Sequence, residues 1–296
     1  MAEILVLGGT RFFGRRLVNE LLQHGHAVTV ASRGMRADDL GSTVARIRLD
    51  RTDPQSMKDA LWGREFDVVY DQIGYNPREA KSLLDAMGDR MGRLVFCSTG
   101  SVYDAHDGLI TEDDFDPSDY PVDLDAAAYE YGEGKRQAEA YLVRFAPCPV
   151  VLARPSFVVS GTDDYTERFD FHVRHVLEGR SVGVHDPDYT ASFITAWDAG
   201  RALYFAGLEM EEDGPLNVVN PGYYNAAGMT RRIAAILGRE ARIHQAADDD
   251  PDLSPYTLPG EHRVDVVRAA KLGFTFPPLD PALPGMVEDV VRRLQA

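Results

Sequence analysis

Cysteine is nearly absent from this sequence of 296 residues, which contains only Cys97 and Cys148. The two positions form neither a metal-binding spacing nor a disulfide framework, and both adjoin apolar runs that are typical of strands. We therefore expect buried, reduced thiols. Long apolar runs are missing too, so neither a membrane span nor a membrane partner is expected.

Positive charge is scarce as well. The chain has 31 Lys and Arg residues against 47 Asp and Glu residues, which gives a formal net charge of -16. Because binding to a nucleic-acid backbone depends on lysine and arginine displacing counterions, we expect no nucleic-acid partner. The acidic run at 246–252 is predicted to be a solvated loop, since a hard-cation site needs spaced ligands and a turn glycine. No metal site is expected.

The rest of the composition, with 44% hydrophobic and 26% charged residues, is typical of a globular protein of one large domain or two joined lobes. The opening MAEILVLGG enters an apolar run without a basic leader or a small-residue cleavage site, so we expect a cytoplasmic protein. Trp62 and Trp197 are expected to be packing residues.

The first half of the chain alternates short apolar runs with amphipathic segments. The apolar runs predict strands at 3–8, 27–32, 45–50, 67–73, 93–99 and 149–155. The segments between them predict helices at 12–25, 53–63, 76–92 and about 125–145. Strands joined by helices of this length form a parallel sheet that is covered on both faces, so we predict an α/β fold with a doubly wound sheet.

The second half predicts a smaller C-terminal lobe. Helical spacing recurs at 168–179, 226–238, 267–274 and 286–295, among segments rich in proline, glycine and aspartate. We assign 1–159 to the larger lobe, with 191–220 returning to it. Residues 160–190 and 221–296 are assigned to the smaller lobe.

The stretch LVLGGTRFFGRR, residues 6–17, predicts a dinucleotide-binding turn. Gly8, Gly9 and Gly14 lie between the first strand and the first helix, where a pyrophosphate can bind the backbone N–H groups of the helix N-terminus. Gly8 would permit the tight turn, Gly9 would remove a side chain from it, and Gly14 would let the helix approach the sheet. The alternative is a glycine-rich turn that only connects the two elements.

Arg11 and Arg33 bear on which dinucleotide is bound. Proteins of this fold that prefer NAD usually carry an acid at the end of the second strand, where this chain has Ser32 and Arg33. Arg11 and Arg33 are expected to converge on a 2′-phosphate, which favours NADP and leaves NAD possible. Alternatively, one or both stack on adenine or face solvent. Asp50 and Arg51 are expected near the adenine, unless Asp50 caps the following helix.

Tyr131 and Lys135 lie four residues apart, on one face of a predicted helix. A hydride-transfer enzyme acting on an alcohol or ketone must move a proton at the substrate oxygen, and a phenol can do this when nearby positive charge stabilises phenolate. Thr99 ends the fifth strand, where the sites of open α/β sheets form, and would orient the substrate oxygen toward Tyr131. Alternatively, Thr99 is only a turn residue that ends the strand.

Several motifs together resemble the extended short-chain dehydrogenase/reductase family, in its epimerase and dehydratase branch. They are GGTRFFG (8–14), STGSVY (98–103), YGEGK (131–135), ARPSFVVSG (153–161), FITAWDAGRAL (193–203), PLNVVN (215–220) and RAAKLGF (268–274). The resemblance implies a Rossmann lobe, a substrate lobe and a homodimer, with Thr99, Tyr131 and Lys135 as catalytic triad. The further cofactor contacts that it implies are Thr10, Phe12, Phe13, Gln72, Ile73, Lys135, Pro155, Ser156 and Phe157.

The sequence also departs from that family. Arg11 replaces the middle glycine of the fingerprint, and YDQIG replaces the usual segment after the fourth strand. GGTRFFG with SRG and DYTERFDFHV is most similar to a subgroup that includes chloroplast stem-loop RNA-binding proteins. Tyr165, Arg168 and His172 are expected to line the substrate pocket, unless at least one of them is a packing or surface residue.

The leading hypothesis is therefore an NAD(P)-dependent oxidoreductase or epimerase that acts on a secondary alcohol or ketone of a small molecule, with a sugar or nucleotide-sugar favoured. The residues do not separate an epimerase from a reductase. Two alternatives on the same scaffold are an RNA-binding protein, which the net acidity disfavours, and a cofactor sensor without catalysis, which would be expected to lose Tyr131 or Lys135.

Overall fold

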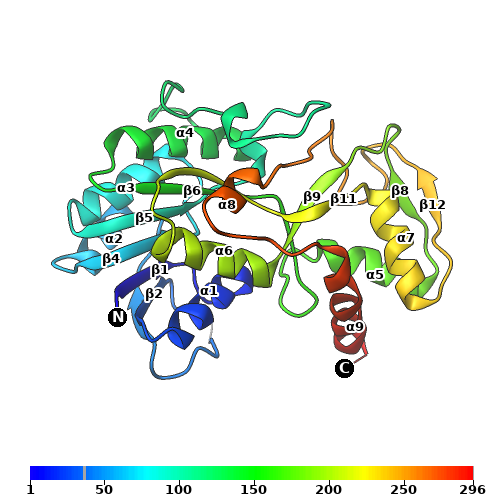
Figure 1. The fold of residues 1–296 in the computed structure, drawn as a ribbon, viewed down its shortest axis with the longest axis horizontal. Helices are drawn as coiled ribbons and strands as arrows, with labels where there is room; N and C mark the ends of the chain where they lie inside the picture. Colours follow the sequence, from blue (N-terminus) through cyan, green and yellow to red (C-terminus); the bar gives the residue numbers. More distant parts are fainter. Residues whose placement is uncertain (36–37, 296) are drawn as a thin grey trace.

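The computed structural model describes residues 1–35 and 38–295, and its largest feature is a parallel sheet (Figure 1). The strands are β1 (Glu3–Leu7), β2 (Ala27–Ser32), β3 (Ala45–Arg48), β4 (Phe66–Asp71), β5 (Met91–Cys97), β6 (Val150–Pro155) and β10 (Gly214–Val218). They are ordered β10-β6-β5-β4-β1-β2-β3, and every pair is parallel. The predicted doubly wound α/β sheet of the Rossmann type is confirmed.

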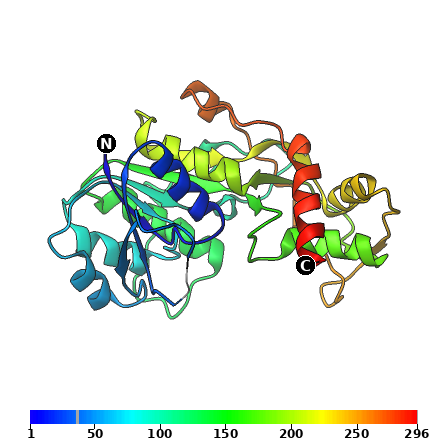
Figure 2. The ribbon, with the colours of Figure 1, turned by 90° about the horizontal axis from the view of Figure 1, so that it is seen from below.

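Helices cover both faces of this sheet (Figures 1 and 2). One face is packed by α1 (Phe12–Gln23) and α6 (Ala196–Leu208), and the other by α2 (Pro54–Leu61), α3 (Pro77–Met87) and α4 (Tyr131–Phe145). Strand β1 shows why both layers are needed. Its Ile4 and Val6 enter the cluster under α1 and α6, whereas Leu5 and Leu7 enter the opposite cluster, because successive strand residues face opposite sides.

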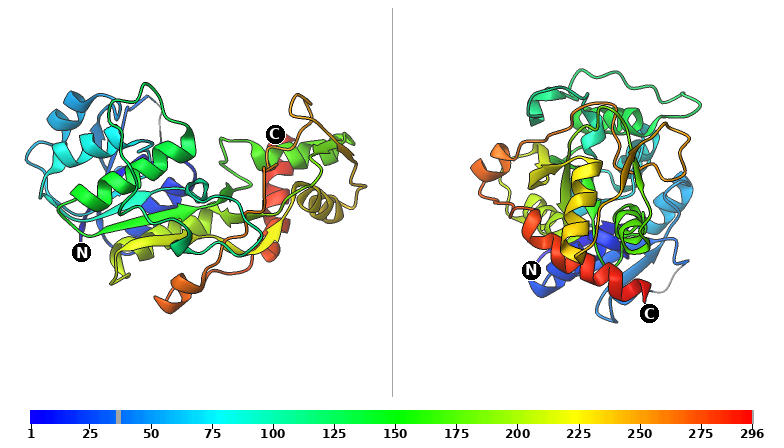
Figure 3. Two further views of the ribbon diagram at one scale, coloured as in Figure 1. Left: turned by 90° about the horizontal axis from the view of Figure 1, so that it is seen from above. Right: turned by 90° about the vertical axis from the view of Figure 1, so that its right-hand side faces the viewer.

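The smaller lobe, on the right of Figure 1, combines short sheets with helices (Figure 3). One sheet has the order β11-β9-β7, and the other pairs β12 with β8. The elements are β7 (Phe157–Val159), α5 (Arg168–Glu178), β8 (Val182–Val184), β9 (Ala191–Thr195), β11 (Asn220–Tyr224), α7 (Ala226–Leu237), β12 (Ile243–Gln245) and α9 (Leu283–Leu294). Their apolar side chains form a separate core cluster. The short helix α8 (Val267–Lys271) instead places Ala269 in the core of the large sheet.

Two helix boundaries differ from those predicted. The helix predicted from about 125 begins at Tyr131, because Glu130 is still extended, with φ −62° and ψ 149°. The helix predicted over 76–92 ends at Met87, where Gly88 takes a positive φ of 56° and stops it. Residues 91 and 92 consequently belong to β5.

The segment 191–220, which was predicted to return to the larger lobe, is shared between the two lobes. Strand β9 pairs with β7 and β11 in the small sheet, whereas α6 and β10 pack in the large lobe. Between β10 and β11 the chain changes sheets, and the side chain of Asn220 accepts a hydrogen bond from the Thr195 backbone N–H at 2.8 Å. The lobe boundaries themselves stay a prediction.

The structure also bears on four smaller expectations. Trp62 and Trp197 are 81% and 53% exposed, so their prediction as packing residues is wrong. The acidic run is not simply solvated, because Asp250 contacts the His244 ring at 3.0 Å and Asp252 contacts His175 at 3.1 Å. Cys97 is buried, Cys148 is half-buried, and both are free thiols. Within 1–35 and 38–295, no helix combines the length and hydropathy required to cross a bilayer.

A buried ion pair fixes α4 against the sheet. Arg154 of β6 binds Glu139 of α4 through two hydrogen bonds of 2.6 and 3.1 Å, and both side chains are completely buried. The guanidinium also donates to the Tyr103 hydroxyl at 3.0 Å and to the Phe115 carbonyl at 3.1 Å. The Tyr103 hydroxyl donates to Asn217 of β10 at 2.6 Å. These bonds orient α4, whose first residue is Tyr131, relative to β6 and β10.

Replacing Glu139 by Gln should lower the free energy of unfolding by about 3–5 kcal/mol, because the Arg154 charge would stay buried without its counter-charge. The matched control is Asp85→Asn, which breaks the exposed Lys81–Asp85 pair and should cost less than about 0.5 kcal/mol. Urea unfolding of both variants measures the difference. Equal losses would contradict the role of the buried pair.

Candidate active site

A cavity of about 660 Å³ lies at the carboxyl ends of β1, β4, β5 and β6, and residues of the smaller lobe complete its wall. It lies where the strand order reverses between β1 and β4, which is the position at which doubly wound sheets bind ligands. The predicted residues that line it are Phe12, Phe13, Gln72, Thr99, Tyr131, Lys135, Pro155, Ser156, Phe157, Tyr165 and Arg168.

The glycine turn after β1 has no space for side chains. Gly8 adopts a φ of +96°, and a Cβ there would lie 2.6 Å from the Ile73 side chain. A Cβ at Gly14 would lie 2.3 Å from the Gln72 side-chain oxygen and 2.9 Å from the Gly8 carbonyl. At Gly9 it would lie 2.8 Å from two valine side chains. These close approaches bring the start of α1 directly against the end of β4.

The N-terminus of α1 can accept an anion. Its N-cap Arg11 is extended, no side chain of the described residues caps the helix, and its first turn contains no acid. The first backbone N–H groups of a helix are then available to a bound anion. Thr10 precedes this N-cap, and Phe12, the first helical residue, has a φ of +53°, which is uncommon for a bulky side chain.

The structure brings Thr99, Tyr131 and Lys135 to one cavity. Tyr131 is 52% exposed, whereas Lys135, one helical turn further along α4, is 2% exposed. The Lys135 ammonium donates to the carbonyl oxygens of Gly74 at 2.7 Å and Cys97 at 2.6 Å. The phenol can therefore contact a ligand, while the ammonium is fixed by the two carbonyl groups. Thr99 caps a short 3-10 turn, its hydroxyl accepting from the Ser101 N–H at 3.1 Å.

Burial is the largest influence on the acidity of these groups. It raises the pKa of the Tyr131 phenol above its ordinary value, and a hydrogen bond with Thr99 opposes the rise more than any other interaction does. Burial also lowers the pKa of Lys135 and raises that of the Cys97 thiol to about 11. In the protein alone the phenol is thus protonated near neutrality, and more positive charge at the site would be needed to ionise it.

The cavity fits a nicotinamide dinucleotide. Gln72 Nε2, Ser98 Oγ and Ser156 Oγ are buried in its wall and have no hydrogen-bond partner within the described part of the chain. Buried polar atoms normally have partners, so a ligand with several polar groups is expected among them. An open helix N-terminus and three crowded glycines match a pyrophosphate in particular.

Among the residues predicted around the adenine and its ribose, Arg33 and Asp50 lie near each other, whereas Arg51 forms a buried ion pair. The charge of Arg33 helps to lower the pKa of Asp50, although hydrogen bonds from Thr52 contribute more. Arg51 is buried and pairs with Asp71 at 2.5 Å, so it braces the end of β4. Asp50 does not cap α2, because the N-cap is Asp53.

The Arg11 side chain contacts the smaller lobe. Its guanidinium lies over the ring of Tyr165, 4.4 Å from the centroid. The convergence of Arg11 and Arg33 on one phosphate stays a prediction.

The three residues expected at a substrate pocket have different surroundings. Tyr165 and Arg168 line the main cavity. His172 is a packing residue, since its ring contacts Thr230 at 2.9 Å and Ser254 at 3.0 Å, stacks on Tyr256, and has a pKa lowered to about 3 by burial.

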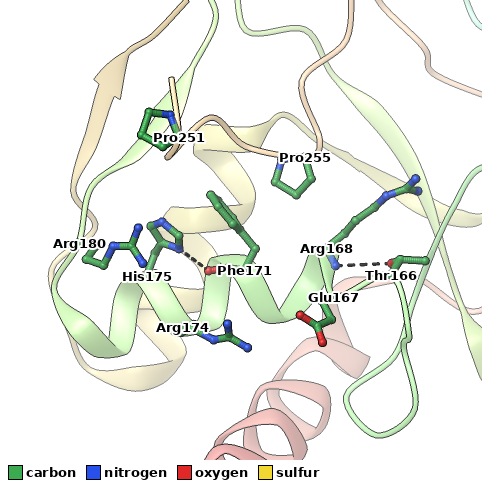
Figure 4. A pocket seen from close by; sticks show the side chains of 9 residues that line it. All are labelled: Thr166, Glu167, Arg168, Phe171, Arg174, His175, Arg180, Pro251 and Pro255. Atoms are coloured by element: carbon green, nitrogen blue, oxygen red, sulfur yellow. Dashed lines mark hydrogen bonds between the residues drawn. The ribbon is translucent and has the colours of Figure 1, made fainter. Parts of the chain in front are cut away.

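A second cavity of about 380 Å³ runs along α5 (Figure 4). Arg168 lies at the N-terminal end of this helix and Arg180 beyond its C-terminal end, with Phe171 and His175 between them (Figure 4). Thr166 and Arg168 line both cavities, so the two are adjacent.

One part of the main cavity escaped sequence reasoning. Leu258, Pro259, Gly260 and His262 form part of its wall, and the His262 ring contacts the Gly100 carbonyl oxygen at 2.9 Å. Neither a motif nor a periodic pattern marks 258–262. Its position depends on the chain returning to β9, where the N–H of Ser192 donates to the His262 carbonyl at 3.1 Å.

Residues 4–222 match the NAD dependent epimerase/dehydratase family, and the chain belongs to that family. Its fold is similar to MoeE5 solved with UDP-glucose and NAD, at a TM-score of 0.75, 23% identity and 99% of each chain. It is also similar to dTDP-glucose 4,6-dehydratase of Bacillus anthracis in complex with NAD, at a TM-score of 0.78, 16% identity, and 99% and 97% of the two chains. At these identities the likeness concerns the fold.

A curated relative is the chloroplast stem-loop binding protein of 41 kDa b from Arabidopsis thaliana, which is 34% identical over 130 residues. The match covers 39% of this chain and 34% of that protein, so the chain matches about a third of the relative's length. The family is NAD-dependent, and the two solved relatives carry NAD.

Substituting Gly14 by Ala should lower the free energy of unfolding by about 1–3 kcal/mol, because the new methyl group would collide with the Gly8 carbonyl. Gly285→Ala is the control. Gly285 lies in α9, and a methyl group added there would meet no described atom within 4 Å, so alanine should stabilise the protein by up to about 1 kcal/mol. Chemical unfolding compares them, and a Gly14 variant as stable as the parent would refute the crowding argument.

Proposed function

We propose that this chain is an NAD(P)-dependent enzyme that oxidises or reduces a secondary alcohol or ketone carbon of a nucleotide-sugar, with Tyr131 as general acid and base. The carrying observation is that the half-exposed Tyr131 and the buried Lys135 line the same cavity as Thr99 and the start of α1. Membership of an epimerase/dehydratase family supports the reaction class, and UDP-glucose in a solved relative supports the substrate class.

The proposed steps assign one task to each side chain. The nicotinamide, when bound, supplies hydride chemistry. Thr99 donates a hydrogen bond to the substrate oxygen and orients it, and Tyr131 takes the hydroxyl proton on oxidation and returns it on reduction. Lys135, anchored to Gly74 and Cys97, places a positive charge behind the phenol and favours phenolate once a cationic ring lies nearby.

The preference for NADP remains a proposal, and Arg33 supports it most directly. The Arg11 guanidinium contacts Tyr165, so its convergence with Arg33 on a 2′-phosphate stays a prediction. Arg33 is exposed at the end of β2, close enough to Asp50 to affect its pKa. A single guanidinium can still form charge-assisted hydrogen bonds with a phosphate.

Two other functions receive less support. The name of the Arabidopsis relative refers to stem-loop binding, but the match covers a minor part of that protein, and the net charge of -16 opposes RNA binding. A sensor without catalysis leaves Tyr131 and Lys135 without a task. Cytoplasmic residence and a homodimer stay predictions.

Tyr131→Phe should reduce kcat on a nucleotide-sugar by on the order of 10²–10⁴-fold, because the proton would have no acceptor at the substrate oxygen. The affinity for NADH should stay within about twofold, since the phenol hydroxyl is proposed to act on the substrate. Chromatography of the products from UDP-glucose and dTDP-glucose measures turnover, and fluorescence titration measures NADH binding.

Tyr129→Phe is the matched control. It removes a hydroxyl two residues away that donates to the Asp123 carbonyl, outside the cavity, and should keep full turnover. Equal rates for the parent and Tyr131→Phe would reject the acid–base assignment. A parent chain that binds NADH but converts no nucleotide-sugar would reject the substrate class.

Arg33→Ala should weaken NADP⁺ binding by about tenfold, which corresponds to the loss of one charge-assisted hydrogen bond. NAD⁺ binding should change by less than about twofold, because NAD⁺ lacks the 2′-phosphate. Isothermal calorimetry with both dinucleotides gives the two ratios. A parent protein that binds NAD⁺ at least as tightly as NADP⁺ would refute the NADP preference.

A further inference from the structure

The segment 160–167, which joins β7 to α5, lies against the N-terminal half of α1 and is named here the bridging segment. The Asp163 carboxylate pairs with Arg15 at 3.0 Å and with Arg16 at 3.4 Å. Arg16 also donates to the Thr162 hydroxyl at 2.9 Å. The side chains of all three charged residues are between 18% and 23% exposed, so solvent and salt can reach these pairs.

Tyr165 extends these contacts to the glycine turn. The Arg11 guanidinium lies 4.4 Å from the centroid of its ring, and the Phe12 ring meets it edge-on at 5.6 Å. Arg11 and Phe12 are the N-cap and the first residue of α1, the place proposed for the pyrophosphate. The bridging segment therefore contacts both the mouth of the dinucleotide site and the helix behind it.

The two ends of the bridging segment are held differently. On the smaller lobe, Arg293 of α9 binds both carboxylate oxygens of Asp170 at 2.8 Å and the Gly161 carbonyl at 3.2 Å. A Cβ at Gly161 would lie 2.4 Å from the Met286 carbonyl, so this end is tightly packed. On the α1 side the contacts are partly exposed ion pairs, an edge-on ring pair and a cation–π contact, which are individually weak and reversible.

We propose that the bridging segment is a strap that closes over the phosphate-binding end of α1 and retains the dinucleotide between turnovers. The proposal rests on the proposed function, because it requires a dinucleotide in this cavity. Release would require Tyr165 to leave Arg11 and Phe12, and Asp163 to leave α1. Binding need not be tighter at equilibrium, since a strap slows entry and exit alike.

Retention has a consequence for the reaction class. A net reduction requires the spent dinucleotide to leave after each turnover. A redox-neutral conversion, in which the substrate regains the hydride that it gave, requires no exchange. A strap that slows exchange therefore favours the redox-neutral class, such as epimerisation.

The experiment measures NADH release from the full-length protein, by chasing bound NADH with excess NAD⁺ and following its fluorescence. Asp163→Asn should speed release by about fivefold, because it removes two partly exposed ion pairs between the lobes. The control is Asp39→Asn, which breaks the other ion pair of Arg15, at 2.6 Å, within the larger lobe. This variant should release NADH at the parent rate.

The dependence of the NADH release rate on ionic strength is a second measurement. It would be absent if the bridging segment had only a structural role. Raising the ionic strength should speed release from the parent and leave Asp163→Asn nearly unchanged, because the screened ion pairs are already gone. Tyr165→Ala tests the contacts of the Tyr165 ring with Arg11 and Phe12 independently, and it should also speed NADH release. Thermal unfolding shows whether each variant is folded at the assay temperature.

The outcomes separate the two proposals. Release rates that are the same in the parent, Asp163→Asn and Tyr165→Ala would overturn the strap and leave the proposed function intact. A folded parent chain that binds neither NADH nor NADPH would overturn both.

Discussion

The close approach of α1 to the sheet governs the rest of the site. Gly8 and Gly14 leave no room for a methyl group between the turn, Ile73 and Gln72, so the helix begins where the strand order reverses. That position aims its unpaired N–H groups along the carboxyl ends of β4, β5 and β6. The other cavity residues are positioned relative to this helix start. They include Tyr131, whose helix α4 is attached to the sheet by the Arg154–Glu139 ion pair.

Electrostatics add a second constraint. Lys135 is almost completely buried, and its ammonium is held by two backbone carbonyls rather than by a carboxylate. Among the described residues no carboxylate pairs directly with it, and burial lowers its pKa, although the charges of Asp71, Glu139 and Glu79 oppose this shift. Burial raises the pKa of the Tyr131 phenol, so the protein alone holds Tyr131 in its acid form. An acid–base role then depends on charge that arrives with the ligands.

Much of this architecture could be predicted from local pattern. Alternating apolar runs and amphipathic segments identified the central strands. The spacing of the three glycines identified the crowded turn before α1, and that of Tyr131 and Lys135 identified two residues that line one cavity. The failures occurred where long-range packing decides. His172 is enclosed by Thr230 and Ser254, and 258–262 is placed at the cavity by contacts of His262 with β9 and with Gly100. Helix ends were misjudged because backbone angles at Gly88 and Glu130, rather than side-chain spacing, set them.

The repeated passage of the chain between the large sheet and the smaller lobe has an evolutionary consequence. Strand β7 leaves the large sheet, α6 and β10 return to it, β11 leaves again, and α8 comes back before α9. The part of the molecule that would recognise a substrate is thus not a contiguous cassette that recombination could exchange. New specificity on this scaffold has to arise by single substitutions and loop changes within a frame whose two halves are inherited together.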